Sequence, residues 1–430
     1  MRNTQCLRGV HGRRSETARV ARILQRQYLL LERVLHAPNK NIKMIRKALL
    51  FMVTGFILFS ALPASGQAPV LRSAYHDYRV VTVVEGLERP WSFAFLPGGD
   101  MLVTELPGRL RIVREGSLLD QPVAGVPEVS AGGQGGLLDV VLHPDFTSNR
   151  LIYLSYSKPL ADSEGATTAV VRGRFENDRL TEVEQIFEAD SRGRGHYGCR
   201  LAFDRNGYLF ITVGDRQRPP EGDLEAHSAQ DLSNHHGTVI RIHDDGRVPT
   251  DNPFVGQTGA LPEIWSYGHR NAQGLAIHPE TGDLWINEHG PQGGDELNLI
   301  RPGLNYGWPV VGYGVNYRSG TAIHEGIQRE GMESPVHFWV PSIAPSGFLI
   351  YTGDRFPEWR GNFFVGGLSG QQLARLTVDG QEVQQEETLH FGRGRIRDVR
   401  QGPDGYIYLA IDDRRGGLTP IVKLEPADEH

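Results

Sequence analysis

One sequence pattern, typical of two consecutive strands, recurs six times along the chain and limits its possible folds more than any other feature. Each copy consists of an apolar strand, a turn rich in Asp, Pro and Gly, a second apolar strand and a polar exit. Alternation of apolar and polar residues on both sides of a tight turn is typical of a β-hairpin, and hairpins repeated every roughly 45 to 75 residues are typical of propeller blades. The copies span residues 91–105, 136–155, 199–215, 273–288, 346–366 and 397–412.

The repeat predicts an all-β fold, a six-bladed β-propeller in which each hairpin forms the inner half of a blade. The 52 Gly and 26 Pro agree with a chain of many turns rather than long helices. A two-sheet sandwich is the alternative, but it would not repeat one two-strand pattern six times. In a closed propeller, ring closure also protects the strand edges from pairing with other chains. Weaker alternating segments are expected to supply outer strands at residues 110–114, 169–175, 238–242 and 373–378.

Two connections are much longer than the others and are rich in Gly, Pro, Asn and Tyr. They lie around residues 216–262 and 290–345. Loops longer than a connection requires tend to build binding and catalytic sites. We therefore expect function in this sector of the ring.

The N-terminal region differs from the rest of the chain. Residues 1–43 are rich in Arg and lack apolar alternation, which predicts either an extension upstream of the true start or a disordered tail. Residues 44–68 begin with Met44, a short basic stretch and an apolar run, and then small residues, which is the pattern of a secretory signal peptide. A membrane anchor is the alternative, but the run of about 15 residues is short for a span of about 20.

These boundaries predict a single propeller domain over residues 69–430, located in the periplasm or secreted, with no membrane span in the mature chain. A twin-arginine export signal is disfavoured because Arg13 and Arg14 lie far from the apolar run. Cys6 falls in the part to be removed, so Cys199 would be the one cysteine left and no intramolecular disulfide would form.

Removal of the N-terminal part makes the chain strongly acidic. Residues 1–66 hold 12 Lys and Arg but 2 Asp and Glu, so the formal net charge changes from −6 to −16. Nucleic acids and anionic membrane surfaces are held mainly by excess Lys and Arg. The balance therefore disfavours these partners and favours a neutral or cationic small molecule.

Six short motifs connect this chain to a known family. They are HYGCRLAF (196–203), VGD (213–215), GHRNAQGLA (268–276), EHGPQGGDELN (288–298), NYGWP (305–309) and RIRDV (395–399). In this order they resemble the soluble quinoprotein glucose and aldose sugar dehydrogenases, over about residues 80–420. The resemblance implies oxidation of an aldose at its C1 hydroxyl to the lactone, with pyrroloquinoline quinone (PQQ) and calcium as cofactors.

Hydride transfer from a sugar C1 requires a base that takes the hydroxyl proton. His196 suits this role because an imidazole titrates near pH 6.5, and it is expected to open the inner strand of the third blade and to face the axial funnel. Asp215 ends the paired strand of the same hairpin and is expected to orient the imidazolium. The family has a matching pair with these roles. The plainer alternatives are an exposed turn histidine and an aspartate that caps a turn.

PQQ carries three carboxylates, which arginine pairs with through its planar fork. Motif position selects Arg270, Arg395 and Arg397, with Asn271 and Gln134 as uncharged hydrogen-bonding partners. Arg395 and Arg397 are expected on one strand face, where like charges disfavour each other unless an anion lies between them. Two solvated arginines on a blade rim are the alternative.

The resemblance implies further contacts with the cofactors. The quinone would be lined by Tyr317, Ser342 and Ala344, and Ser369 stands where the glucose enzymes have a lysine, so one cationic contact is lost. A hard cation suits oxygen ligands, and the resemblance places calcium at the backbone carbonyls of Gly290 and Pro291. A second, structural calcium would use Glu296 and Tyr306, unless the acidic pair 295–296 only caps a turn.

Two other functions remain open for such a propeller. A lactonase would need an axial calcium held by side-chain carboxylates and amides, but the axial candidates here are mostly arginines. A non-catalytic propeller that binds sugar or protein is supported by the loss of the lysine at Ser369. The sequence leaves open the sugar, the electron acceptor and the choice between monomer and homodimer.

Overall fold

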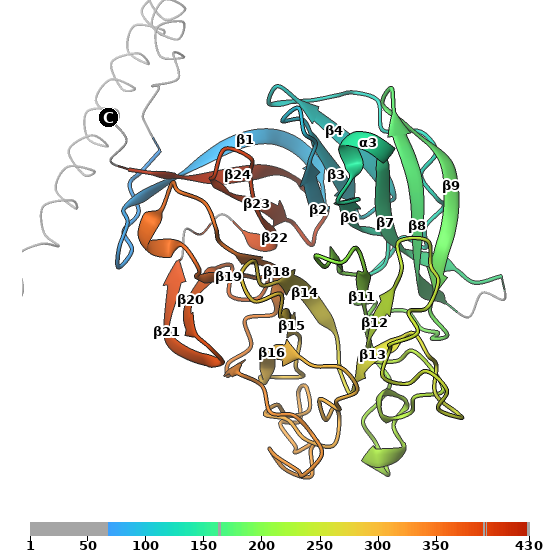
Figure 1. Cartoon of the computed structure of the whole chain (residues 1–430). Helices are drawn as coiled ribbons and strands as arrows, with labels where there is room; N and C mark the ends of the chain where they lie inside the picture. The colour runs from blue at the N-terminus through green and yellow to red at the C-terminus, as the bar shows by residue number, and fades with distance from the viewer. Residues whose placement is uncertain (1–67, 162–164, 390–391, 393, 428–430) are drawn as a thin grey trace, which may run out of the picture. The chain divides into compact units, whose positions relative to one another are not determined.

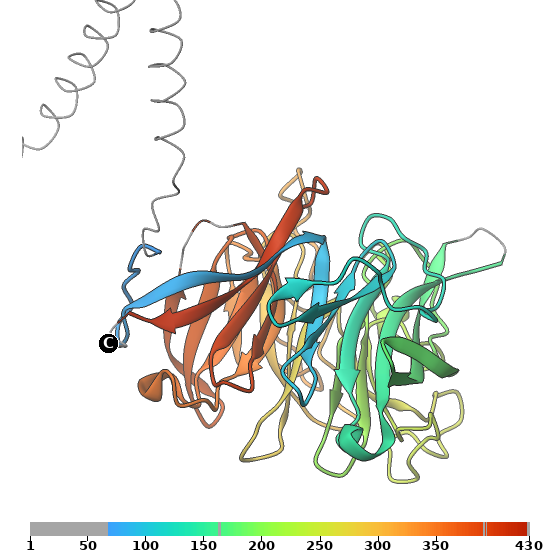
Figure 2. The ribbon, with the colours of Figure 1, turned by 90° about the horizontal axis from the view of Figure 1, so that it is seen from above.

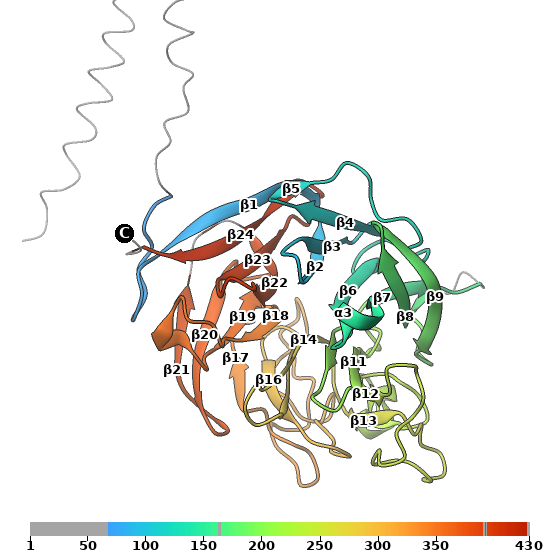
Figure 3. The ribbon, with the colours of Figure 1, turned by 45° about the horizontal axis from the view of Figure 1, so that its top comes forward.

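Six antiparallel sheets of four strands each surround a central axis in the computed structural model, which describes residues 68–161, 165–389, 392 and 394–427. Figure 1 and Figure 3 show the sheets as blades placed one after another around a ring. The predicted six-bladed β-propeller is confirmed. From Ala68 onward the described chain forms one unit.

The first three blades follow the chain from the innermost strand outward, so each strand pairs with the next in sequence. The first blade contains β2 (Pro90–Phe95), β3 (Met101–Glu105), β4 (Arg109–Arg114) and β5 (Ser117–Leu118). The second contains β6 (Leu137–Leu142), β7 (Leu151–Pro159), β8 (Ala166–Glu176) and β9 (Arg179–Glu188), with the short helix α3 (Phe146–Asn149) between β6 and β7. The third contains β10 (Leu201–Phe203), β11 (Leu209–Val213), β12 (Thr238–Ile242) and β13 (Ile264–Tyr267).

The next two blades have the same order. The fourth contains β14 (Ala272–Ile277), β15 (Leu284–Glu288), β16 (Asp295–Ile300) and β17 (His337–Trp339). The fifth contains β18 (Pro345–Ile350), β19 (Phe363–Gly367), β20 (Leu373–Asp379) and β21 (Glu382–Leu389). Three single-turn 3-10 helices lie in the loops: η1 (Leu224–Ala226), η2 (Ser228–Gln230) and η3 (Pro357–Trp359).

The sixth blade joins the two ends of the described chain and so closes the ring. Its inner three strands are β22 (Arg395–Gln401), β23 (Ile407–Asp412) and β24 (Leu418–Pro426), and its outer strand is the N-terminal β1 (Tyr78–Glu88). β1 pairs antiparallel with β24 from Tyr78↔Pro426 to Glu88↔Leu418. Figure 2 shows the blue β1 lying along the red strands of this blade.

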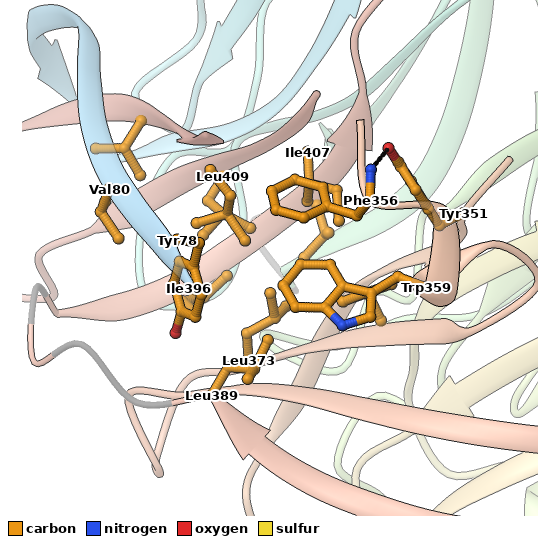
Figure 4. Close-up of a cluster of buried hydrophobic side chains, with 14 of the residues drawn as sticks. Tyr78, Val80, Tyr351, Phe356, Trp359, Leu373, Leu389, Ile396, Ile407 and Leu409 are labelled. Atoms are coloured by element: carbon orange, nitrogen blue, oxygen red, sulfur yellow. Dashed lines mark hydrogen bonds between the residues drawn. The ribbon is translucent and has the colours of Figure 1, made fainter. Parts of the chain in front are cut away.

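The hydrophobic core lies between neighbouring blades. Figure 4 shows the cluster in which side chains of the fifth and sixth blades meet, with Tyr78 and Val80 of β1 packed into it. Phe356 and Trp359 stack there with ring centroids 4.3 Å apart. Because β1 contributes buried side chains as well as backbone hydrogen bonds, it belongs to the core of the closed ring.

A buried polar network links four blades close to the axis. Asp139 at β6 accepts hydrogen bonds from Ser92 Oγ of β2 (2.6 Å) and from the backbone N–H of Leu201 at β10 (2.9 Å). Two arginines complete it: Arg400 of β22 contacts Asp139 at 2.8 Å, and Arg200 contacts Asp398 at 3.0 Å. The inner strands are thus held to one another by charged side chains as well as by packing.

Five of the six innermost strands carry a break in register near the start of the strand: β2, β6, β14, β18 and β22. Such a bulge adds one residue to a strand and turns its side chain away from the regular alternation. In β2, β14 and β22 the residues at the break are Trp91, Gln273 and Arg397. These three meet at the axis, since Arg397 donates to Gln273 Oε1 at 3.0 Å and lies over the Trp91 ring at 5.7 Å.

The predicted extension 1–43 and the predicted signal peptide, up to residue 67, lie outside the described residues. Within the described part of the chain, no helix has the length and apolar character needed to cross a bilayer.

Candidate active site

His196 lies in the segment before β10 rather than on the strand, and its backbone is fixed on both sides. Its φ of 45° is in the left-handed region, which a residue with a side chain adopts only where its surroundings hold it. The backbone N–H donates to Gln134 Oε1 at 2.7 Å, and the carbonyl accepts from Arg216 Nη1 at 2.6 Å. The expectation that His196 opens the inner strand was wrong by five residues, because the strand begins at Leu201.

Gly214 allows the segment of Asp215 to approach His196 closely. A Cβ at residue 214 would lie 2.1 Å from the His196 carbonyl oxygen, so no side chain fits. Asp215 itself follows the last residue of β11 by two positions, and its backbone N–H donates to the carbonyl of Arg270 at 2.9 Å. The third and fourth blades therefore meet at this pair.

The His196 ring is oriented by a carboxylate that is itself fixed. Nδ1 of His196 lies 2.6 Å from Oδ1 of Asp215, and Oδ2 of Asp215 accepts from Trp308 Nε1 at 2.9 Å. A carboxylate only accepts hydrogen bonds, so Nδ1 carries the ring proton and Nε2 carries the lone pair. Among the described residues, none is within hydrogen-bonding distance of Nε2.

Burial and charge set the protonation of this pair. Burial lowers the pKa of His196 below its ordinary value; the Asp215 carboxylate opposes this effect, and Arg270 adds to it. Burial raises the pKa of Asp215, but His196, Arg270 and the Gln217 N–H outweigh it, and the pKa lies below its usual range. At neutral pH the pair is therefore a neutral imidazole beside a carboxylate, the state that a general base requires.

A cavity of about 480 Å³ opens in front of His196. Its walls include six residues predicted from the sequence, namely Gln134, His196, Asp215, Arg270, Pro291 and Tyr317. The volume is in the range of small-molecule sites. The long segments singled out in the sequence supply much of the wall, including residues 217–220, 308 and 316–317.

The three predicted arginines differ in how far they are paired. Arg395 contacts Asp412 at 3.2 Å and the Leu368 carbonyl at 3.2 Å. Arg270 donates through Nη1 to the carbonyls of His289 (3.0 Å) and Gly290 (2.6 Å), while its Nε is buried with no partner among the described residues.

Arg397 has no carboxylate within ion-pair distance among the described residues. Gln273 is its hydrogen-bonding partner. Burial lowers the pKa of Arg397 to about 10; Asp412 opposes this effect, and Arg395 adds to it. Arg395 and Arg397 were expected on one face of the same strand. The regular alternation of β22 does not hold there, because its register breaks between Ile396 and Asp398.

Six of the residues expected around the quinone do not line this cavity, namely Arg395, Arg397, Asn271, Ser342, Ala344 and Ser369. Asn271 is buried, and its Oδ1 accepts from the Gly198 N–H at 3.2 Å. Ser342 Oγ and the Ala344 N–H both donate to Asp295 Oδ2, at 2.5 and 2.8 Å. Ser369 is exposed, and its N–H donates to the Ile343 carbonyl.

A second, much smaller cavity of about 20 Å³ collects the residues expected to bind metal. Gly290, Pro291, Glu296 and Tyr306 line it together with Glu288. Burial and the neighbouring Glu288 carboxylate raise the pKa of Glu296 to about 8. The Tyr306 hydroxyl donates to the Leu299 carbonyl at 2.6 Å, so this group is already engaged. In the described parts of the chain, no three His, Cys, Asp or Glu side chains gather as a metal site.

Three residues of the site were not assigned a role from the sequence. Trp308 binds Asp215, Arg216 binds the His196 carbonyl, and His289 lines the large cavity. Trp308 and His289 stand inside the motifs NYGWP and EHGP, and Arg216 directly follows VGD. Their positions inside or directly beside these motifs could have identified them from the sequence.

This chain belongs to the glucose/sorbosone dehydrogenase family, whose model matches residues 87–420. It is 43% identical over 371 residues to the aldose sugar dehydrogenase YliI of Escherichia coli K12, which covers 84% of this chain and 98% of that protein. It is 26% identical over 426 residues to quinoprotein glucose dehydrogenase B of Acinetobacter calcoaceticus, with 81% and 87% covered.

A solved structure of the PQQ-bound form of aldose sugar dehydrogenase from Streptomyces coelicolor matches with a TM-score of 0.64 at 27% identity, covering 85% of this chain and 99% of that one. The family that the six motifs indicated is therefore confirmed, and with it the enzyme class of sugar dehydrogenases.

Proposed function

We propose that this protein oxidises aldoses at the C1 hydroxyl to the lactone, with PQQ as the electron acceptor in the site and His196 as the base. The observation that carries the proposal is the His196 ring at a cavity of about 480 Å³: its Nδ1 is held by Asp215 at 2.6 Å, and its Nε2 has no partner among the described residues. The sugar dehydrogenases of the family support the reaction class.

His196 takes the proton of the C1 hydroxyl on Nε2, because Nδ1 is occupied by the hydrogen bond to Asp215. The charge that appears on the ring is balanced by Asp215, which Trp308 and the Gln217 N–H keep in place. Gln134 and Arg216 hold the backbone of His196 and so keep the ring in position. A general base of this kind contributes about 10²–10⁴ to the rate.

The arginines fit a polyanionic cofactor. Arg397 is a half-buried cation without a carboxylate partner among the described residues, and Arg270 has a buried Nε with no hydrogen-bonding partner among them. Bidentate pairing with carboxylates would satisfy both. Arg395 would add a third contact, with Asn271, Gln134, Tyr317, Ser342, Ala344 and Ser369 as the family positions around the quinone. When bound, PQQ supplies the acceptor for the two electrons that leave C1 as hydride.

The residues also fit calcium, most clearly in the small cavity. Glu288 and Glu296 bring two carboxylates together, since the Asn298 side chain donates to both, at 3.0 and 3.1 Å. A divalent cation suits such oxygen ligands. The carbonyls of Gly290 and Pro291 would hold the other calcium ion, although the Gly290 carbonyl already accepts from Arg270 at 2.6 Å.

We further propose that the protein is exported, to the periplasm or outside the cell, with Met44 as its start. The support is the signal-peptide pattern of residues 44–68. A monomer or homodimer would pass electrons to an acceptor outside the cytoplasm.

Reconstitution tests the function directly. Protein expressed from Met44 is freed of ligands and assayed by dye reduction with a broad panel of aldoses, with PQQ and calcium added singly and together. We expect turnover only when both are present. His196→Gln should retain the quinone absorbance and lose turnover, whereas Arg397→Ala should weaken quinone binding.

Two results would contradict the proposal. Absence of turnover across the panel in protein that binds quinone would exclude the reaction, and absence of a bound chromophore would favour a sugar-binding or protein-binding propeller. Quinone affinity of Arg397→Ala equal to that of the parent protein would refute the role of this arginine.

A further inference from the structure

The large cavity is cationic, although the chain around it is acidic. Besides Arg270, two further arginines line it, Arg218 and Arg414. Asp215 is the one carboxylate among the lining residues, and its two oxygens are already engaged with His196, Trp308 and the Gln217 N–H. The cavity therefore carries more positive than negative charge when it is empty of ligand.

Arg218 and Arg414 have no counter-charge in the protein. Among the described residues, neither guanidinium has a carboxylate within 4.0 Å or a hydrogen-bonding partner. Both side chains are exposed. In contrast, their close neighbour Arg415 is paired with Asp413 at 3.7 Å. The proposed cofactor contacts use other arginines, so these two charges have no role in the proposed function.

The backbone of Arg218 is fixed relative to the catalytic pair. Its N–H donates to the carbonyl of Asp215 at 3.1 Å, and its carbonyl accepts from His227 Nε2 at 3.2 Å. Arg216 and Gln217 before it both have a φ of 58°, and two prolines follow it. This turn presents Arg218 at the cavity from a constrained position.

Arg414 is presented by a second hydrogen-bonded turn, from the opposite end of the chain. It lies in the connection between β23 and β24, where the Gly416 N–H donates to the Asp413 carbonyl and the Arg415 N–H donates to Asp413 Oδ1, both at 2.9 Å. Figure 2 shows this red hairpin rising above the blades. The third and sixth blades thus each place one unpaired arginine at the same cavity.

We propose that the preferred substrate is an aldose with an anionic group remote from C1, which Arg218 and Arg414 hold while C1 faces His196. The group is the carboxylate of a uronic acid or the phosphate of a 6-phosphosugar, since guanidinium binds both in the same bidentate manner. This inference rests on the proposed function. The reaction at C1 is unchanged: the C1 hydrogen leaves as hydride to the bound quinone, the O1 proton passes to His196, and the anionic group takes no part.

Four sugars that differ only at C6 test the preference. The holoprotein is assayed with glucose, glucuronate, glucose 6-phosphate and 6-amino-6-deoxyglucose. We expect kcat/KM for at least one anionic sugar to exceed that for glucose by about tenfold, as for a charge-assisted hydrogen bond, and the amino sugar to be poorest. The advantage should shrink as salt rises from low to high, because the arginines are exposed. The better anionic sugar distinguishes carboxylate from phosphate.

Variants assign the preference to the two arginines. Arg218→Gln and Arg414→Gln should each reduce the ratio of kcat/KM for the anionic sugar to that for glucose by about tenfold. The matched controls Arg415→Gln and Arg247→Gln, which remove exposed arginines outside the cavity, should leave the ratio unchanged. A preference for glucose, or a ratio that neither cavity variant alters, overturns the proposal.

A binding measurement separates this inference from the proposed function. Methyl β-glucuronide and methyl β-glucoside cannot be oxidised at C1, so their affinities are measured by calorimetry in the reconstituted protein. Tighter binding of the glucuronide, lost in both cavity variants, supports the inference even if no sugar is turned over. Equal affinity overturns it. Weaker quinone binding in the variants, with the sugar ratio unchanged, assigns the arginines to the cofactor and also overturns it.

Discussion

Asp215 determines which nitrogen of His196 carries the proton. Both carboxylate oxygens accept, Oδ1 from the His196 ring and Oδ2 from the Trp308 indole. In Asp215→Asn the amide has one oxygen for these donors, and its NH₂ group favours the ring tautomer with the proton on Nε2. We expect kcat to fall by about 10³, within the range for a general base, while quinone absorbance is retained. Stopped-flow reduction of the bound quinone measures this directly.

Trp308→Phe is the matched control, since it removes one donor to Asp215 and leaves the carboxylate. In this variant kcat should fall by about tenfold, the effect of one hydrogen bond to a charged group. A loss in Asp215→Asn no larger than this would show that the tautomer does not limit the rate.

The pH dependence follows from the burial of His196. Because burial lowers its pKa below the ordinary value of 6.5, the neutral, active form persists as pH falls to that lowered pKa and is lost below it. We expect kcat/KM to be flat through neutral pH and to decrease on an acid limb with an apparent pKa below 6.5. An acid limb at or above 6.5, measured with a neutral sugar, would contradict the assigned environment.

The sequence predicted single residues well where motifs of one hairpin brought chemical groups together, as for His196 and Asp215, which lie 2.6 Å apart, although His196 precedes its strand by five residues. It predicted them less well where the role depends on a partner far away in the chain. Ser342 and Ala344 bind Asp295 instead of lining the cavity, and the bond from Trp308 to Asp215 joins residues 93 positions apart. No local pattern encodes such a pairing.

At the scale of the strands, the hairpins could be predicted and the bulges could not. Apolar alternation marks the strands because one face of each packs against a neighbouring blade. A bulge adds one residue without a change of composition, so the register breaks that place Trp91, Gln273 and Arg397 together left no signal. The short outermost strands, such as β5, also escaped prediction because few of their residues are buried.

The inner strands are also joined by charge, and this can be tested at Asp139. Its carboxylate is fully buried and faces Arg400 at 2.8 Å and Arg200 at 3.5 Å. Asp139→Asn keeps the shape but leaves the buried Arg200 and the partly buried Arg400 with less counter-charge. We expect a loss of about 3–5 kcal/mol in the free energy of unfolding, typical of a broken buried ion pair, measured by urea denaturation.

Asp178→Asn provides the comparison, because Asp178 pairs with Arg114 on the surface at 2.8 Å. Exposed pairs contribute little to stability, so its denaturation midpoint should stay close to that of the parent protein. Equal midpoints for the two variants would show that the axial network is not stabilising.

At the scale of the whole molecule, net charge and local charge point to different ligands. The formal net charge without residues 1–66 is −16, which favours neutral or cationic partners. The cavity is lined by Arg218, Arg270 and Arg414 against one carboxylate, Asp215. A ligand inside the cavity responds mainly to these near charges, because charges beyond about 8–10 Å are screened by salt. The net charge summed over the sequence could not show that positive charge gathers at the cavity.

Ring closure is the other property of the whole molecule, and the sequence did not predict its closing strand, β1. Tyr78 of β1 is 1% exposed and packs edge-on against Trp359 of the fifth blade, with ring centroids 6.0 Å apart. Tyr78→Ala leaves a cavity in this core and should cost about 3–5 kcal/mol. Because the closed ring shares one core, we expect a lower Tm in a single transition, coincident by fluorescence and circular dichroism. Tyr75→Ala, at a residue 52% exposed, should change Tm little. An early separate transition in Tyr78→Ala would show instead that β1 detaches from a ring that is stable without it.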